Sequence, residues 1–164
     1  MIQCMDMGTT AVLPTSLMPT AGLVQQAREA AKIVGLDPAL VCAVVEQESA
    51  WNTWAVRFEP AFFARYIHPA VPSKPTTEQT FDAASFGLMQ VMGEVARELG
   101  FKGVFLTELC EPIVGLAYGC KKLAACLKAT AGDERAALLR YNGGGNAAYA
   151  DQVLARVSHY TVVQ

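Results

Sequence analysis

A glutamate at the end of an apolar segment is the first residue whose position suggests chemistry. Glu48 lies four residues after Val44 and seven after Val41, so in a helix it shares their apolar face. A carboxyl there would lie at the edge of a core and at the partially negative C-terminal end of the helix. Burial and the helix dipole both disfavour the charged form, so we expect a raised pKa for Glu48. A raised pKa suits a general acid that works near neutral pH.

Three short motifs follow one another along the chain. They are ESAWN at residues 48–52, SFGLMQVM at residues 85–92 and YNGG at residues 141–144. Their order, with a long helix expected between the second and third, resembles the catalytic domain of the soluble lytic transglycosylases. That family lies within the wider superfamily of goose-type lysozyme. The resemblance covers about residues 23–160.

The resemblance implies roles for the residues of these motifs. Glu48 is expected to be the catalytic acid, with Tyr141 against it, because a phenol hydroxyl can hold a carboxyl in position. Gln90 offers a donor and an acceptor for N-acetyl or hydroxyl groups, and Trp51 offers an apolar face for a sugar ring. The residues expected to bind substrate are Ser85, Gln90, Met92, Trp51 and Asn142.

Members of this family cleave the β-1,4 bond between N-acetylmuramic acid and N-acetylglucosamine in peptidoglycan. In the implied reaction the acid protonates the leaving oxygen, with help from the acetamido group of the substrate. The same carboxylate then removes a proton from the 6-hydroxyl, and a 1,6-anhydro ring closes. This substrate-assisted route needs no second carboxylate.

The sequence also departs from the family pattern, which leaves the product open. Thr53 stands where proline is common, and residues 54–84 form a long insert. The segment Arg57–Pro60, followed later by Ser85-Phe86-Gly87, resembles phage-encoded N-acetylmuramidases. In such a hydrolase Glu59 or Asp82 would hold the attacking water. A third alternative is a non-catalytic glycan-binding or virion structural domain.

Helical periodicity dominates the rest of the chain, and no convincing alternating strand stands out. We expect a mainly α fold: an irregular N-terminal arm at residues 1–19, then a single lysozyme-like catalytic domain at residues 20–164. The insert at 54–84 contains four prolines and predicts a long loop or lid with short helical turns. The expected helices run from a cap at Thr20 to Gly35, from Asp37-Pro38 to about Ser49, over Ser85–Gly100, over Pro112–Ala129, from Asp133 to Tyr141, and over about 146–160.

Composition excludes several classes of protein. The 164 residues are 52% hydrophobic and 17% charged, which is typical of one compact domain. A net charge of -2 gives no electrostatic case for nucleic acid. Five cysteines without a CxxC pair, beside only two histidines, predict no metal site, and no cofactor is expected. Buried free thiols are favoured for Cys42 and Cys120, whereas a bridge from Cys126 to Cys110 or Cys120 stays open.

The N-terminal segment does not resemble a targeting signal. The first basic residue is Arg28, and the charge-free stretch Met7–Ala27 is broken by Pro14 and Pro19. We therefore expect synthesis in the cytoplasm, no membrane insertion, and a monomer that acts on the glycan strands of the bacterial cell wall. A phage endolysin released by a holin, or a virion-associated lysin, would fit this pattern.

Overall fold

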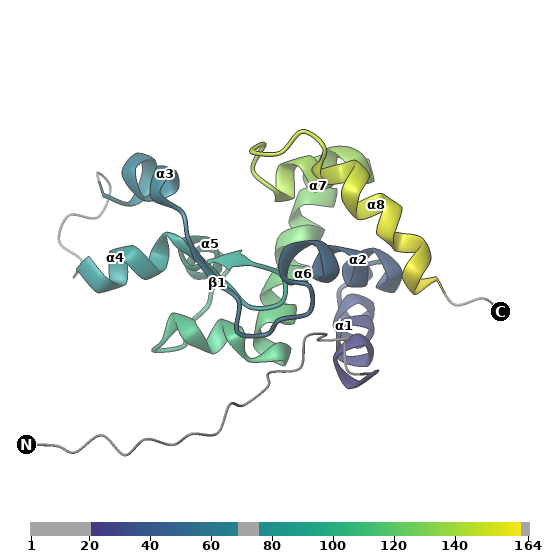
Figure 1. The fold of residues 1–164 in the computed structure, drawn as a ribbon, viewed down its shortest axis with the longest axis horizontal. Coiled ribbons are helices and arrows are strands. Elements are labelled where there is room, and N and C mark those ends of the chain that lie inside the picture. The colour runs from purple at the N-terminus through teal and green to yellow at the C-terminus, as the bar shows by residue number, and fades with distance from the viewer. Residues whose placement is uncertain (1–20, 69–75, 162–164) are drawn as a thin grey trace, which may run out of the picture.

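The computed structural model describes residues 21–68 and 76–161, and it confirms the mainly α prediction (Figure 1). The predicted N-terminal arm and the cap at Thr20 lie outside these residues. The elements are α1 (Ala21–Ile33), α2 (Pro38–Ser49), β1 (Val56–Phe58), α3 (Pro60–Phe62), the π-helix η1 (Phe63–Ile67), α4 (Thr76–Asp82), β2 (Ala84–Phe86), β3 (Val91–Met92), α5 (Gly93–Glu98), the 3-10 helix η2 (Leu106–Cys110), α6 (Pro112–Ala129), α7 (Glu134–Tyr141) and α8 (Tyr149–Tyr160).

Helix α2 forms the centre of the core, and its start is the one that the sequence predicts. The Asp37 carboxylate accepts a hydrogen bond from the Ala39 amide at 2.8 Å, and Pro38 occupies the first turn. Every residue from Ala39 to Val45 is buried. The helix ends where Ala50 takes a left-handed conformation at φ 48°. This sharp end leaves Glu48 in the last turn of a buried helix.

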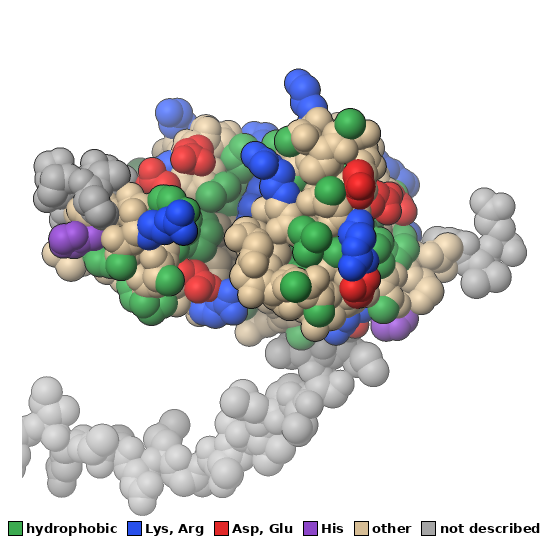
Figure 2. All heavy atoms as spheres, turned by 90° about the horizontal axis from the view of Figure 1, so that it is seen from above, with side chains coloured by type: hydrophobic (Ala, Val, Ile, Leu, Met, Phe, Trp, Pro, Cys, Tyr) green, Lys and Arg blue, Asp and Glu red, His purple; other side chains and the backbone are tan. Residues whose placement is uncertain are grey.

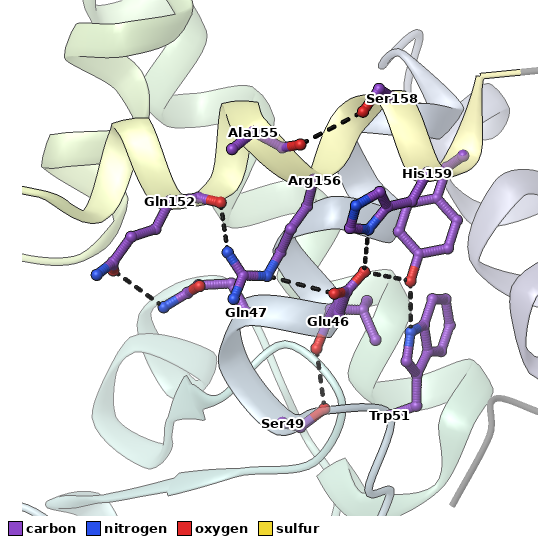
Figure 3. Close-up of polar contacts among 11 residues, drawn as sticks. Glu46, Gln47, Ser49, Trp51, Gln152, Ala155, Arg156, Ser158 and His159 are labelled. Carbon is purple, nitrogen blue, oxygen red and sulfur yellow. Dashed lines mark hydrogen bonds and ion pairs between the residues drawn. The ribbon is translucent and has the colours of Figure 1, made fainter.

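Helix α8 packs along α2 and is held there by polar contacts (Figure 3). The Glu46 carboxylate accepts a hydrogen bond from the Tyr160 hydroxyl at 2.7 Å and lies 3.4 Å from the Arg156 guanidinium. Gln47 donates to the Gln152 side chain at 3.2 Å. The long helix α6 packs against α1 on one side and α7 on the other. These contacts bring the C-terminal end of α2 beside the start of α8.

A small antiparallel sheet replaces the first half of the helix predicted over residues 85–100, so that prediction is wrong for residues 85–92. The strand order is β1-β2-β3, and Ser85 in the central strand pairs with Arg57 on one side and Met92 on the other. Only α5 is helical in the predicted range 85–100. Strands of two or three residues are too short to display an alternating pattern, which explains why the sequence did not reveal them.

The insert at residues 54–84 forms one side of the molecule. Its described residues form β1, α3, η1 and α4, and residues 69–75 are not described. In Figure 1, α3 and α4 lie at the left of the view, while α7 and α8 lie at the upper right. The sheet and α6 lie between these two parts. The fold therefore has two sides that face each other across the end of α2.

The cysteines that the structure describes are free and buried: Cys42, Cys110, Cys120 and Cys126. The bridges from Cys126 to Cys110 or Cys120, left open by the sequence, are therefore absent. Burial raises the pKa of Cys42 to about 11 and that of Cys120 to about 12, so both thiols stay protonated. Cys4 lies outside the described residues.

Among residues 21–68 and 76–161, no helix has the length and apolar character that crossing a bilayer requires. No group of three or more His, Cys, Asp or Glu side chains is placed to hold a metal ion in that part of the chain.

Candidate active site

An open groove of about 790 Å³ runs between the insert and the α7–α8 side of the molecule. Seen from above, the surface is hollowed between these two parts, and hydrophobic and basic side chains gather there (Figure 2). The lining residues are Gln47, Glu48, Arg57, Glu59, Ala61, Phe62, Arg65, Tyr66, Ser85, Gln90, Met92, Val95, Lys122, Arg140, Tyr141, Asn142, Gly143, Gly145, Asn146 and Tyr149. Most of the residues predicted to bind or act on substrate therefore meet in one place.

Glu48 lies in this groove in a half-buried position. The Tyr149 hydroxyl donates a hydrogen bond of 2.5 Å to its Oε1 atom. Burial raises the pKa of Glu48 above its usual value, while the Tyr149 hydrogen bond and the nearby charges of Lys122 and Arg57 lower it in part. The carboxyl is thus biased toward its protonated form and still has partners that stabilise its charged form. A group of this kind can both give and take a proton.

Tyr141 lines the groove together with Glu48, but its hydroxyl bonds to a partner other than the Glu48 carboxyl. Its side chain is 3% exposed, and its hydroxyl donates a 2.7 Å hydrogen bond to the Met89 carbonyl oxygen. Burial raises the pKa of Tyr141 far above its usual value, so the hydroxyl stays a donor. Tyr141 therefore ties α7 to the turn between β2 and β3. The tyrosine that bonds to the carboxyl is Tyr149.

Tyr149 is not among the residues predicted from the sequence, and only its position along the chain could have indicated it. Tyr149 is a second tyrosine, eight residues after Tyr141, at the start of the last expected helix. It is 3% exposed, and burial followed by the nearby Glu48 charge raises its pKa far above the usual value. The hydroxyl consequently keeps its proton and donates a hydrogen bond to Glu48.

Lys122 was also missed. It lies three residues after Gly119 and four before Cys126 on α6, and both of those residues are buried, so this helical position faces inward. Its Nζ lies 3.9 Å from the centre of the Tyr141 ring, a cation–π contact. Burial lowers the pKa of Lys122, and the Glu48 charge opposes that shift. The lysine places a positive charge beside the catalytic candidate.

Three predicted binding residues from the second motif line the groove through the sheet. Ser85 is 3% exposed, and its hydroxyl donates to the Gln90 amide oxygen at 2.8 Å. The Gln90 amide nitrogen donates to the carbonyl oxygens of Ala55 and Gly87, each at 3.0 Å. Both polar ends of Gln90 therefore stabilise the sheet and its turn. Met92 is half-buried in the same wall.

Trp51 does not face the groove, so the prediction that it presents a sugar-binding surface is wrong. Its side chain is 4% exposed, and its indole N–H donates to the Tyr160 hydroxyl at 2.8 Å (Figure 3). The indole belongs to the core between the end of α2 and the end of α8. Trp51 therefore packs in the core, where the Tyr160 hydroxyl accepts the hydrogen bond of its indole N–H.

Asn142 lies in the groove wall, as predicted, at the beginning of the glycine-rich loop. With the amide oxygen turned toward the loop, it accepts hydrogen bonds from the amides of Gly145 and Asn146 at 3.3 and 2.9 Å. The side chain therefore shapes the loop that connects α7 to α8. The loop thereby fixes the position of Tyr149, the first residue of α8.

The two candidate second acids differ in position. Glu59 lines the groove, and one of its carboxylate oxygens lies 2.5 Å from the Arg57 guanidinium. Asp82 is completely buried and does not line the groove, so it cannot hold a water against a bound sugar. The proposal of Asp82 as water-holding residue is therefore wrong, and Glu59 is the one that stays open.

The mainly α domain, with Glu48 in an open groove, has the arrangement expected of a lysozyme-like domain. The model of the family described as "Transglycosylase SLT domain" matches residues 25–156, and the chain belongs to this family. Peptidoglycan is the substrate of the family. No curated protein and no solved structure matched the chain.

Proposed function

We propose that this protein is a peptidoglycan lytic transglycosylase that uses Glu48 as general acid and then as general base. The observation that supports this most directly is the half-buried Glu48 carboxyl in the groove, with its hydrogen bond from Tyr149 and its raised pKa. The proposed cleavage is at the β-1,4 bond between N-acetylmuramic acid and N-acetylglucosamine. Family membership supports the reaction type.

In the first step, protonated Glu48 gives its proton to the glycosidic oxygen, and the bond from that oxygen to C1 breaks. The acetamido oxygen of the muramic acid residue bonds to C1 and disperses the positive charge. The Glu48 carboxylate that results is stabilised by the Tyr149 hydroxyl and the Lys122 charge. In the second step it removes the proton of the 6-hydroxyl, whose oxygen displaces the acetamido oxygen from C1. The carboxyl is then protonated again for the next cycle.

A hydrolytic muramidase is the second candidate, and the position of Glu59 is the observation that favours it. Glu59 lines the same groove as Glu48. In an inverting hydrolase a second carboxylate activates water on the face of the sugar opposite the acid. Glu59 also forms an ion pair with Arg57, which is a structural contact within the insert.

Mass spectrometry of the muropeptides released from purified peptidoglycan distinguishes these candidates. A transglycosylase yields 1,6-anhydro-muramic acid ends, and we expect the Glu59→Gln variant to release the same products at a rate within about threefold of wild type. Reducing muramic acid ends, lost together with activity in Glu59→Gln, would instead establish hydrolysis. Binding to peptidoglycan without any product would support the non-catalytic alternative.

Replacing Tyr149 with phenylalanine is expected to shift the pH dependence of activity. The Tyr149 hydrogen bond lowers the pKa of Glu48, so its loss raises that pKa further. Because the general acid must be protonated, the alkaline limb of the kcat/KM profile should move to higher pH. At neutral pH we expect a rate loss on the order of tenfold, since the carboxyl loses its orientation. The measurement is the pH profile of muropeptide release.

Tyr141→Phe is the matched control for this prediction. It also removes one phenol hydroxyl from the groove wall, but that hydroxyl bonds to the Met89 carbonyl and not to Glu48. Its alkaline limb should therefore stay where it is in the wild type, while the free energy of unfolding falls by about 1–2 kcal/mol. Equal shifts in both variants would contradict the assignment of Tyr149.

The charge of the groove supports an anionic cell-wall substrate. Its lining contains four basic residues, Arg57, Arg65, Lys122 and Arg140, against the two acidic residues Glu48 and Glu59. Peptidoglycan carries carboxylates on its peptide stems, so the positive charge of the groove favours its binding.

We further propose a monomer that acts as a phage endolysin, released by a holin, or as a virion-associated lysin. The resemblance of Arg57–Pro60 to phage muramidases supports that origin.

A further inference from the structure

We infer that Phe62 and Tyr66, on the segment formed by α3 and η1, build a sugar-stacking subsite for the glycan strand. This inference rests on the proposed function, because it assigns the occupant of the groove as a peptidoglycan strand. It gives the insert a role in binding, separate from the chemistry at Glu48. The segment resembles none of the three motifs that pointed to the family.

One face of this segment is turned to the groove. Ala61, Phe62, Arg65 and Tyr66 all line it, and their spacing of one, four and five residues is that of a single helical face. The other face packs against the protein: Ile67 is 1% exposed, and the half-buried Phe63 ring lies 5.8 Å from the Phe58 ring. Ile67 therefore anchors the segment, which leaves the groove-facing side chains available for a ligand.

The two groove-facing rings form one continuous surface. The Phe62 and Tyr66 ring centres are 4.9 Å apart, with an angle of 47° between the planes. Tyr66 is 49% exposed, and the Arg65 guanidinium lies 5.1 Å from its ring centre. Aromatic surface left open to water is unfavourable until a ligand covers it. The C–H face of a pyranose ring can cover such a surface while its hydroxyls bond to the polar tips nearby.

The backbone of the segment is itself unusual. The His68 amide donates to the Phe63 carbonyl oxygen at 3.0 Å, an i to i+5 bond that makes this a π-helical turn. Such turns are rare and occur frequently at functional sites. Here the turn places Tyr66 beside Phe62 while Ile67 stays in the core. The geometry thus combines a fixed anchor with a paired aromatic surface in the same groove as Glu48.

The test uses a double variant, Phe62→Ala with Tyr66→Ala, made in two backgrounds. In the Glu48→Gln background, binding to purified peptidoglycan is measured by co-sedimentation, and we expect the dissociation constant to rise about tenfold. In the active background, KM for muropeptide release should rise by about the same factor, with kcat within about twofold. Trp54→Ala is the matched control. Trp54 is an aromatic residue of the same insert, 71% exposed and outside the groove, so this variant should behave as wild type.

Unchanged binding and unchanged KM in the double variant would overturn the inference. If the alanine variant unfolds at a lower temperature than its parent, Phe62→Leu with Tyr66→Leu takes its place, because leucine fills space without a flat face. Equal binding by that variant would overturn the inference as well. A different result would contradict the proposed function alone. In that case the wild type would release no muropeptides, but its binding to peptidoglycan would still depend on Phe62 and Tyr66.

Discussion

Replacing Glu48 with glutamine is expected to reduce the release of muropeptides from peptidoglycan by about a thousandfold or more. Glutamine keeps the shape of the side chain and can still accept the Tyr149 hydrogen bond, but it has no proton to give to the leaving oxygen. The loss should appear in kcat and leave binding to peptidoglycan intact. Chromatography and mass spectrometry of the soluble products measure it.

Glu46→Gln is the matched control, two residues away on the same helix. Glu46 does not line the groove, and its partners are Arg156, His159 and Tyr160 on α8. We expect this variant to keep activity within about threefold of wild type and to lose a little stability, since partly exposed ion pairs contribute about 0–1 kcal/mol. Activity retained by Glu48→Gln, or lost equally in both variants, would refute the assignment of Glu48 as the acid.

The same substitution at Glu48 also has a predicted effect on stability. Burial raises the pKa of Glu48 in the folded state above its unfolded value. The unfolded chain therefore releases this proton at lower pH, and stability is lost as pH rises through the raised folded pKa. Glutamine has no such charge to bury, so Glu48→Gln should melt at a higher temperature than wild type at neutral and alkaline pH. The difference should fall in acid, which thermal melts across pH would show.

Replacing Gly87 with alanine is expected to lower the free energy of unfolding by about 3 kcal/mol. Gly87 lies in the turn after β2 with φ 69°, a conformation that alanine disfavours. An added Cβ would also meet the Leu109 carbonyl oxygen at 2.3 Å, and that oxygen belongs to backbone that cannot rotate away. Chemical denaturation measures the loss.

Gly22→Ala is the control for this prediction, since it makes the same chemical change in the first turns of α1. Among the described residues, and apart from the backbone of α1 itself, no atom lies within 4 Å of a Cβ added there, and alanine is the better helix former. We expect its stability to equal or slightly exceed that of wild type. If Gly87→Ala were as stable as Gly22→Ala, the close approach of the β2–β3 turn to η2 would be wrong.

The parts of the fold that the sequence predicted well are those with local signals. Asp37 followed by Pro38 marks the start of α2, and both residues act within their own first turn. The bounds of α6 agree with the predicted Pro112–Ala129, because Pro112 starts the helix and a broad apolar face continues through it. Capping and periodicity depend on residues close together in the sequence, so one sequence is enough to predict helix bounds of this kind.

Two differences from the prediction concern contacts between distant parts of the chain. Trp51 was expected in the groove, but its partner Tyr160 lies 109 residues away. Glu48 was paired with Tyr141, whereas the tyrosine that bonds to it is Tyr149, 101 residues from Glu48. Tyr141 and Tyr149 are both apolar rings with one hydroxyl, and no local pattern decides which of them reaches the carboxyl. That choice depends on how α8 packs along α2.

The docking of α8 also sets the order in which the proposed catalytic groups come together during synthesis. Tyr149, the hydrogen-bond partner of Glu48, leaves the ribosome 101 residues after it, on α8. Proteins are synthesised from the N-terminus onward, so a growing chain holds the carboxyl before it holds the hydroxyl that orients it. With Glu48 as the proposed acid, we expect a chain without a docked α8 to be less active than one in which α8 has folded onto α2.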